Sequence, residues 1–357
     1  MPAFHVETPH ARYSAIVERG LAGRAAHHLP PNVGRVFVIS TEDVWRHQGA
    51  ALARGLKDVT HQVLYLPGGE EHKRLGPLED LAELLVERGA DRTSLVIAFG
   101  GGIVTDMAGF LAAIFMRGIP VVQVPTTLLA QVDAAIGGKT GVNLASGKNL
   151  IGSFHQPLAV LIDPAMLDTL PEREYRAGLY EILKAGIIRE PALFGFLTDR
   201  AADILARHPD AVDHIVAESV RMKAEVVSAD ERERGLRRIL NLGHTFGHAL
   251  ETETEYRRFL HGEAVAFGMR AAVYLAETTG HLSAEDSVDI LDLIQVYGPI
   301  PPLAGVSAER LLGHLVHDKK TVRGKVHFVL PTRIGEVKVV SGIDEKLVLD
   351  AIRAALS

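Results

Sequence analysis

Short runs of uninterrupted apolar residues alternate with helical patterns over the first 165 residues, and this alternation limits the fold more than any other feature of the chain. Strands that are apolar at every position are typical of a sheet covered on both faces. Five β-rich runs of this kind occur, at 35–40, 61–67, 94–99, 119–124 and 158–162. Helical spacing fills the intervals at 41–57, 75–90 and 103–117. The repeated strand–helix–strand order predicts an α/β domain with a Rossmann-like parallel sheet.

The pattern changes near Pro164, beyond which the sequence is mainly helical. A β-hairpin is expected at 325–340, turning around Pro331 to Gly335. We therefore predict an α/β domain over residues 1–170 and a mostly α-helical domain over 171–357, with a cleft between them as a common place for a ligand. The expected helices are 178–188, 190–206, 208–229, 239–252, 262–280, 283–297 and 308–319.

Composition excludes several classes of protein. Lys and Arg number 38 and Asp and Glu 44, a net charge of −6, whereas nucleic-acid binding needs a basic face. The 357 residues include no cysteine, which rules out disulfides and thiolate sites and fits a reducing compartment. The most apolar long stretch, 95–116, carries Asp106 and three consecutive glycines, which disfavours a membrane span. Because the N-terminus lacks the apolar core of a signal peptide, we expect a cytoplasmic protein with no membrane or nucleic-acid partner.

A glycine triplet, Gly100 to Gly102, follows the third apolar run and precedes a helix. Glycines at such a place let the backbone approach a phosphate, and the helix N-terminus supplies N–H donors. Thr126 and Thr127 end the next run at the same carboxyl edge, where open α/β sheets bind ligands. A tight turn, with Asp106 compensating the helix dipole, would also explain the glycine triplet. An N-cap would explain one of the two threonines. The spacing therefore leaves a nucleotide site and a purely structural turn equally open.

A stretch rich in glycine and lysine follows, at 131–152. It holds Lys139, Lys148 and Asn149, and such a backbone is a plausible cradle for an anion. A Walker A loop is excluded, because it would need glycine at Ala134, five residues before Lys139. The alternative is a glycine-rich surface loop.

The helical half carries Glu181, the pair His244 and His248, and His261 close to Glu263. Histidines four residues apart share one helix face, and two histidines with a carboxylate suit a divalent cation such as zinc. Spacing alone leaves a buried, hydrogen-bonded histidine pair equally open, because the chain has 17 histidines. No HExxH motif occurs, which disfavours a zinc protease. Basic side chains that would otherwise indicate solvated helix faces complete the set: Lys184, Lys223, Arg237, Lys319 and Lys320.

Together these segments resemble the 3-dehydroquinate synthase family of sugar-phosphate cyclases. The resemblance implies an enzyme of the shikimate pathway that uses NAD and Zn²⁺ or Co²⁺ to convert the seven-carbon phosphate DAHP to 3-dehydroquinate and phosphate. The implied reaction runs through transient alcohol oxidation, phosphate elimination, re-reduction and aldol closure. The matching segments, in the family's order from about residue 95 to 320, are GGGIVTDMAGF, MRGIPVVQVPTTLLAQVDAAIGGKTGVNLASGKNLIGSFHQP, LPEREYRAGLYEILKAGII, SADERERGLRRILNLGHTFGHA, LHGEAVAFGM and DKK.

The resemblance also implies roles for individual residues. The metal ligands would be Glu181, His244 and His261, and His248 would contact the substrate instead of the metal. Arg117 would reach the site of a neighbouring subunit, which implies a homodimer. The implied NAD contacts are Glu70, Lys73, Gly101, Gly102, Asp106, Thr126, Thr127, Lys139, Lys148 and Thr169. The implied substrate contacts are Asp133, Lys139, Asn149, Lys184, Lys223, Glu233, Arg237, Asn241 and one of Lys319 and Lys320.

Five positions depart from the family's pattern. Thr41 and Asp43 stand where Asp and Asn are frequent, and Thr105 stands where glycine is common. Tyr180 replaces a small residue and Ala185 replaces a tyrosine, next to an implied metal ligand. The departures put the nucleotide contacts near residue 41 in question and remove no implied metal or catalytic group.

Three alternatives follow from the same residues. A cyclase of the 2-deoxy-scyllo-inosose synthase type would act on glucose 6-phosphate, which lacks a carboxylate. Lys223 and Arg237, at the positions implied for a carboxylate, favour DAHP over that substrate. A metal-dependent polyol dehydrogenase would accumulate NADH, and a non-catalytic binding protein would require the implied ligands to coincide by chance.

Overall fold

A computed structural model describes residues 2–317 and 326–357. Lys319 and Lys320, implied as substrate contacts, lie outside these described residues. No helix in the described part is long and apolar enough to cross a membrane.

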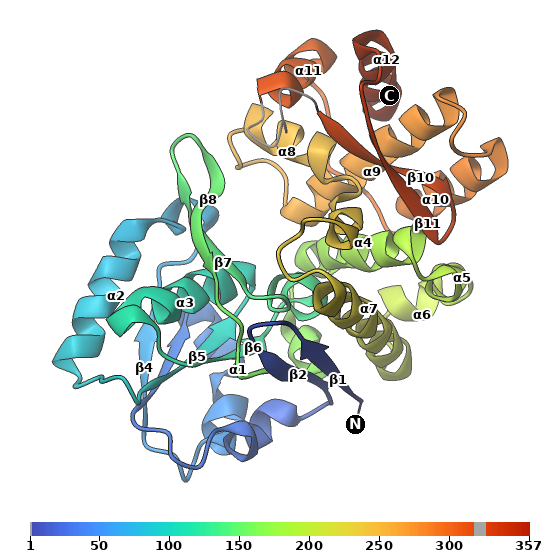
Figure 1. The fold of residues 1–357 in the computed structure, drawn as a ribbon. Coiled ribbons are helices and arrows are strands. Elements are labelled where there is room, and N and C mark those ends of the chain that lie inside the picture. The colour runs from blue at the N-terminus through green and yellow to red at the C-terminus, as the bar shows by residue number, and fades with distance from the viewer. Residues whose placement is uncertain (1, 318–325) are drawn as a thin grey trace. The chain divides into compact units, whose positions relative to one another are not determined.

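The chain forms two compact units, each containing two stretches of sequence (Figure 1). The first unit comprises Met1–Pro171 and Val216–Arg232, and the second comprises Glu172–Ile215 and Glu233–Ser357. Residues of the long helix α7 (Pro209–Ala229) therefore belong to both units. This insertion of one helix into the first unit could not be seen from the pattern of the sequence.

A seven-stranded sheet forms the centre of the first unit. All neighbouring strands are parallel except for one antiparallel pair at an edge, β1 with β2. The five predicted strands are all present, and the predicted α/β class is confirmed; the edge pair was not predicted. In spatial order the strands are β1 (Ala3–Glu7), β2 (Arg12–Val17), β9 (Ala159–Ile162), β6 (Val121–Pro125), β5 (Leu95–Gly100), β3 (Val36–Ser40) and β4 (His61–Tyr65).

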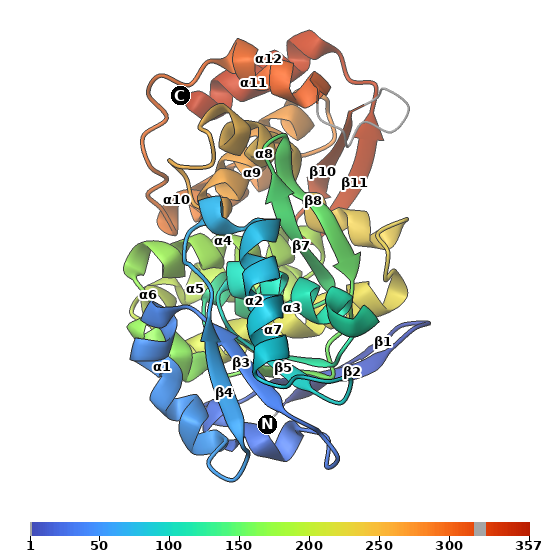
Figure 2. The ribbon, with the colours of Figure 1, turned by 90° about the vertical axis from the view of Figure 1, so that its left-hand side faces the viewer.

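Successive side chains of the central strands enter two different cores. Phe37 and Ile39 of β3 pack with residues of α2 (Leu75–Glu87) and α3 (Gly102–Ile114), whereas the alternate residues of β3 pack with residues of α1 (Glu42–Gly55). In Figure 2, α2 and α3 lie on the side of the sheet that faces the viewer. Because both faces are buried, the four residues from Val36 to Ile39 are all apolar, which explains the apolar run in the sequence.

The glycine- and lysine-rich stretch is an antiparallel hairpin, β7 (Lys139–Leu144) and β8 (Gly147–Phe154), and not a loop. Gly152 lies opposite Gly141, and a Cβ on Gly152 would come within 2.1 Å of the Thr140 carbonyl oxygen. These glycines therefore let two strands approach closely, a role that glycine commonly has inside strands. The structural interpretation as a surface loop is wrong for this stretch.

Helix α9 (His261–Thr278) lies at the centre of the second unit and is buried along most of its length. It contacts α4 (Glu172–Ile188), α8 (His244–Glu253), α10 (Ala284–Val296) and α12 (Glu345–Leu356). The unit also contains α5 (Pro191–Asp199), α6 (Ala201–Leu205), α11 (Ala308–His317) and the predicted hairpin, β10 (His327–Arg333) and β11 (Glu336–Ser341).

Helix boundaries differ from the prediction, and α4 begins at Glu172 instead of at residue 178. The helix expected at 190–206 is two helices that meet at Arg200. The helix expected from 239 begins only at His244. Residues Leu236–Asn241 form a 3-10 helix, and Gly243, with a φ of 79°, precedes α8 as its N-cap. Helix α12 was not predicted. The predicted helical character of this half is confirmed.

Candidate functional site

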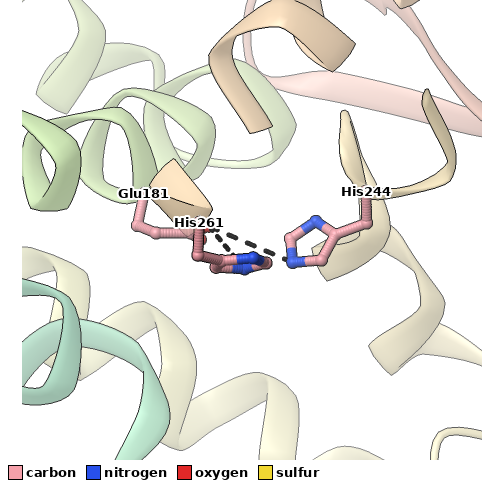
Figure 3. A group of neighbouring side chains, drawn as sticks. All are labelled: Glu181, His244 and His261. Atoms are coloured by element: carbon pink, nitrogen blue, oxygen red, sulfur yellow. Dashed lines mark ion pairs between the residues drawn. The ribbon is translucent and has the colours of Figure 1, made fainter. Parts of the chain in front are cut away.

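Glu181, His244 and His261 converge in the second unit, from three different helices (Figure 3). Glu181 lies in the middle of α4, and His244 and His261 are the first residues of α8 and α9. The Nε2 atoms of His244 and His261 lie 4.0 and 3.9 Å from Oε1 of Glu181, and the two ring centroids are 5.2 Å apart. Ligand atoms around a tetrahedral zinc ion are roughly 3.4 Å apart, so a small contraction would give a coordination site.

The carboxylate of Glu181 requires a cation. Its side chain is 1% exposed, and both of its oxygens are buried without a hydrogen bond in the described part of the chain. The ammonium of Lys184, one helical turn further on, forms an ion pair with Oε2, and the two imidazoles face Oε1. Because an ionised carboxylate is costly to bury unless it is paired or bound to a metal, the donor set fits a divalent cation.

Glycines at the helix crossings allow these helices to approach each other. A Cβ on Gly262, beside His261, would lie 1.9 Å from the carbonyl oxygen of Ala177 in α4. A Cβ on Gly268 would lie 1.8 Å from the carbonyl oxygen of Gly243, which precedes His244. Backbone contact at these two points brings the starts of α8 and α9 close to the middle of α4.

Glu263 holds the N-terminus of α9, and it is not part of the His261 cluster. Its carboxylate accepts a 2.8 Å hydrogen bond from the backbone N–H of Leu260 and two hydrogen bonds from the guanidinium of Arg173. A carboxylate at the third position of a helix satisfies a backbone donor that has no intrahelical partner. Glu263 and Arg173 thus join the first turn of α9, with His261, to α4.

His248 lies one turn after His244 on α8, and its ring centroid is 5.5 Å from that of His244 and 6.0 Å from that of His261. A second group of possible ligand atoms consists of His248, Glu251 and His261. Glu251 is 1% exposed, and its Oε1 lies 3.3 Å from Nδ1 of His261. Sequence reasoning missed Glu251, because an acid at the end of a helical pattern looks like an ordinary surface residue.

Other residues implied as substrate contacts precede α8 in the same unit. The side-chain amide of Asn241 donates a hydrogen bond to the carboxylate of Glu233. The backbone of Glu233 has a left-handed φ of 58°. Arg237 is 2% exposed, which is rare for a guanidinium and requires charged or polar partners. Tyr180, which departs from the family pattern and precedes Glu181 in the sequence, is buried, and burial raises the pKa of its phenol.

In the first unit, Lys223 and Asp133 form an ion pair. Nζ of Lys223 in α7 donates to the carboxylate of Asp133 and, at 2.6 Å, to its backbone carbonyl oxygen. Asp133 belongs to a short π-helix, Ala130–Ala134, that follows β6. The two residues were implied separately as substrate contacts, and the structure brings them together.

A second polar network in the first unit surrounds Lys73. Its ammonium, which is 5% exposed, donates to Asp106 at 2.5 Å and to the side chain of Asn149 at 2.7 Å. Burial raises the pKa of the Asp106 carboxyl, and the Lys73 ammonium opposes this shift. Asn149, which accepts this hydrogen bond from Lys73, lies in the hairpin β7–β8 and has a left-handed φ of 51°. Three segments distant in sequence, which contain Lys73, Asp106 and Asn149, thus meet at one lysine.

Glu70 is joined to this network by a residue that the sequence did not single out. The buried side chain of Asn143 donates to Glu70 at 2.8 Å and accepts the backbone N–H of Asn149 at 2.9 Å. Lys148 lies 3.6 Å from the same Glu70 oxygen. Asn143 could not be identified from the sequence, because a single polar residue within a strand does not indicate which distant side chains it contacts.

The glycine triplet and the two threonines lie at the same edge of the sheet, as predicted. Gly100 ends β5, and its carbonyl oxygen accepts the N–H of Thr126 at 3.0 Å. A Cβ on Gly101 would lie 2.9 Å from the methyl group of Thr127, whose hydroxyl accepts the N–H of Ala130. The capping interpretation therefore holds for Thr127, and Gly101 is needed for close packing.

A cavity of about 410 Å³ opens in the first unit where β3 and β4 end. Thr41, Asp43, Arg46 and Tyr65 are among its lining residues. A hydrogen bond from the Thr41 side chain lowers the pKa of Asp43, so an ionised acid lines this cavity at neutral pH. The positions that depart from the family pattern near residue 41 thus face a space large enough for a small ligand.

Two remaining residues lie apart from these clusters. The hydroxyl of Thr169, in the 3-10 helix Pro164–Thr169, accepts a hydrogen bond from Gln48 at 2.5 Å. Arg117 is exposed, and both it and Met116 have left-handed backbones, with φ of 69° and 49°. Such strain in non-glycine residues is frequent at functional positions.

Comparison with known proteins finds relatives that match the full length of the chain. Residues 63–177 match the family model described as 3-dehydroquinate synthase N-terminal, and residues 178–321 match the one described as 3-dehydroquinate synthase C-terminal. The chain is 72% identical to a 3-dehydroquinate synthase from Solibacter usitatus (strain Ellin6076) over 357 residues, which is 100% of both chains.

Solved structures of sugar-phosphate cyclases are also similar. One is 2-epi-5-epi-valiolone synthase from Streptomyces hygroscopicus subsp. jinggangensis 5008 with NAD⁺ and Zn²⁺ bound, with a TM-score of 0.89, 30% identity and 96% of each chain covered. Another is 2-deoxy-scyllo-inosose synthase complexed with carbaglucose-6-phosphate, NAD⁺ and Co²⁺, with a TM-score of 0.90, 26% identity and 99% of each chain covered.

Proposed function

The chain belongs to the 3-dehydroquinate synthase family, and from that premise we propose which of its residues carry the reaction. Its activity is the NAD- and metal-dependent conversion of DAHP to 3-dehydroquinate and phosphate, with Zn²⁺ or Co²⁺ as the metal. The observation that carries the assignment of residues is the convergence of Glu181, His244 and His261 from three helices.

These three side chains would hold the metal ion. A bound divalent metal acts as a Lewis acid that stabilises negative charge on a substrate oxygen. Lys184 neutralises part of the Glu181 charge, so the pair together presents little net charge beside the two imidazoles. His248, on the same face of α8 as His244, would contact a substrate bound at this centre.

The first unit would hold NAD, as the Rossmann-like domain, and the second would hold the metal. Bound there, NAD would supply the acceptor for the hydride of the substrate alcohol and the source of its return, so no net NADH would accumulate. The pyrophosphate would bind at the N-terminus of α3, where Gly101 precedes and Gly102 begins the helix and the first backbone N–H groups can donate. Lys73 and Asp106 form the polar network next to this edge, with the hydroxyls of Thr126 and Thr127 at the end of the neighbouring strand.

The substrate's charged groups need cations and polar donors. Arg237 presents a planar guanidinium, which suits bidentate pairing with a carboxylate or a phosphate. Lys223 is oriented by Asp133, and Asn241 is oriented by Glu233. We propose that these residues, with Lys139 and Asn149, bind DAHP in the productive orientation.

One assay tests the activity against its alternatives. Purified protein is mixed with NAD, Zn²⁺ and DAHP, and phosphate release is followed together with the absorbance of NADH. We expect phosphate to be released without net NADH. Phosphate release from glucose 6-phosphate and not from DAHP would instead support the 2-deoxy-scyllo-inosose synthase type. Accumulation of NADH with glycerol would support a polyol dehydrogenase.

We also propose that the protein is a homodimer in which Arg117 completes the partner's site. Exposed apolar side chains lie on segments that flank Arg117, namely Ile114, Met116, Phe154 and Leu158. The backbone N–H of Leu158 bonds to Val121, which follows Arg117 closely in sequence. Sedimentation equilibrium should give twice the mass of one chain. Heterodimers of Arg117→Ala with an otherwise inactive variant should then show whether activity depends on Arg117 of the other chain.

The cell context follows from the same assignment. A place in the shikimate pathway and a cytoplasmic location are proposed from the reaction and from the absence of cysteine. Growth of a strain that lacks 3-dehydroquinate synthase, on medium without aromatic amino acids, tests the first. Cell fractionation tests the second.

A further inference from the structure

Glu251 places a buried carboxylate behind one of the proposed metal ligands. It lies near the end of α8, is 1% exposed, and has Oε1 at 3.3 Å from Nδ1 of His261. The other ring nitrogen of His261, Nε2, lies 3.9 Å from Oε1 of Glu181. The imidazole therefore has a carboxylate at each nitrogen, one on α8 and one on α4.

We propose that Glu251 is a positioning residue, which accepts the Nδ1 proton of His261 and so directs the Nε2 lone pair toward the metal ion. A neutral imidazole carries its single proton on one nitrogen and offers a lone pair on the other, and only the lone pair can bind a metal. A carboxylate beside Nδ1 keeps the proton there and raises the basicity of the other nitrogen. This inference rests on the metal centre proposed above.

The position of His261 explains why such a partner is needed. His261 is the first residue of α9, and its side chain is 29% exposed, far more than that of Glu181. Glu263 and Arg173 hold the helix start, through the backbone N–H of Leu260 and the ion pair between their side chains. The contact with Glu251 restrains the ring rotation that helix capping leaves free.

A second metal ion is the competing interpretation, because His248, Glu251 and His261 also form a group of possible ligands. An ion there would need Nδ1 of His261 while Nε2 bound the first ion. The imidazole would then have to lose its remaining proton and bridge two cations. One buried carboxylate that accepts one proton from a neutral imidazole needs no such deprotonation, so the geometry favours the positioning role.

The test compares two acids of the same helix. Glu251→Gln keeps the shape of the side chain and removes its charge, whereas Glu253→Gln makes the same change two residues further on. Glu253 is also largely buried, and its ion pairs go to Arg310 at 2.7 Å and His314 at 3.0 Å instead of to His261. Zinc dissociation constants are measured by competition with a chromophoric chelator, and zinc per chain is counted at saturation.

We expect Glu251→Gln to bind zinc about 10- to 100-fold more weakly, the range found when a partner behind a metal ligand is removed, and Glu253→Gln to bind like the unchanged protein. Zinc content at saturation should be one per chain in all of them. Nitrogen chemical shifts of His261 in the zinc-loaded protein should show the proton on Nδ1.

Three results would overturn the inference. They are unchanged zinc affinity in Glu251→Gln, an equal loss in Glu253→Gln, and a second zinc ion that disappears in Glu251→Gln. Should Glu251→Gln fail to fold, Glu251→Asp replaces it, and zinc affinity equal to that of the unchanged protein would overturn the inference in the same way. His261→Ala separates this failure from that of the metal centre, because retention of zinc in that variant would refute the centre itself.

Discussion

A methyl group at Gly262 should separate the metal ligands without touching any of them. The Cβ of Gly262→Ala would lie 1.9 Å from the carbonyl oxygen of Ala177, 2.6 Å from its carbonyl carbon and 3.0 Å from its Cα. All three are backbone atoms of α4, so no side-chain rotation can relieve the contact. The N-terminus of α9, with His261, must therefore move away from α4, with Glu181.

The size of this movement follows from ordinary contact distances. Raising 1.9 Å to the 3.4 Å of a normal contact requires a displacement of about 1.5 Å. Metal sites tolerate distances within roughly 0.2 Å of the ideal values, so the three ligands could no longer bind one ion well. Misplacement by 1 Å costs about 100-fold in rate, and overpacking costs about 1–3 kcal/mol in stability.

We therefore expect Gly262→Ala to remain folded, to bind zinc poorly and to lose at least about 100-fold in kcat. Zinc binding is measured by chelator competition, kcat by phosphate release, and the free energy of unfolding by urea denaturation. The control is Gly313→Ala in α11, where a Cβ meets nothing within 4 Å and which should be neutral or stabilising by up to about 1 kcal/mol. Zinc affinity and kcat in Gly262→Ala equal to those of the control would refute the reasoning.

Four further predictions follow from the same structure. A chelator should stop phosphate release, and added Zn²⁺ or Co²⁺ should restore it. His261→Ala should lose metal and activity but keep its circular dichroism spectrum, and metal retained in this variant would contradict the ligand assignment. Arg237→Ala should raise the KM for DAHP about 10- to 100-fold and leave NAD binding unchanged in a titration, and an equal loss of both would exclude a substrate role. Asp106→Ala should lower the free energy of unfolding, measured in urea, by about 3 kcal/mol, because the buried Lys73 loses its carboxylate partner. A change near zero would show that the ion pair is not needed for stability. The hydrogen bond from Arg353 lowers the pKa of Glu309 to about 2. The stability that ionised Glu309 adds is therefore complete above pH 4.5 and is lost as the pH falls toward 2. The Tm difference between the unchanged protein and Glu309→Gln should shrink over this range, and a constant difference would contradict the prediction.

The parallel sheet could be predicted from the sequence because its signal is local. Residues 36–39 alternate between two buried cores, so all four are apolar and the strand is visible without any knowledge of its neighbours. The edge strands Ala3–Glu7 and Arg12–Val17 were missed, because the first is mostly exposed and the second ends in a run of only three buried apolar residues. The hairpin at Lys139–Phe154 was missed for a related reason, since its glycines serve close strand contact and hide the alternation.

The chemical groups of the site were visible in the sequence, but their grouping was not. Spacing alone paired His244 with His248, which share a helix face, and offered Glu263 as a neighbour of His261. In the structure, His261 and Glu181 join His244 from separate helices, and Glu263 caps a helix end. Residue type thus indicates what chemistry is available, whereas the helix crossings decide which residues share it.

The sequence by itself determined the α/β class, the order of the parallel strands along the chain and the identity of most candidate groups, because burial on both faces and functional residue types leave local traces. Only the tertiary structure decided that three helices meet within ligand distance, that Asn143 links Glu70 to Asn149, and that Glu251 lies behind His261. These contacts depend on backbone approach at Gly262 and Gly268 and on burial of single polar side chains. Both arise between segments far apart in sequence, where local pattern carries no information.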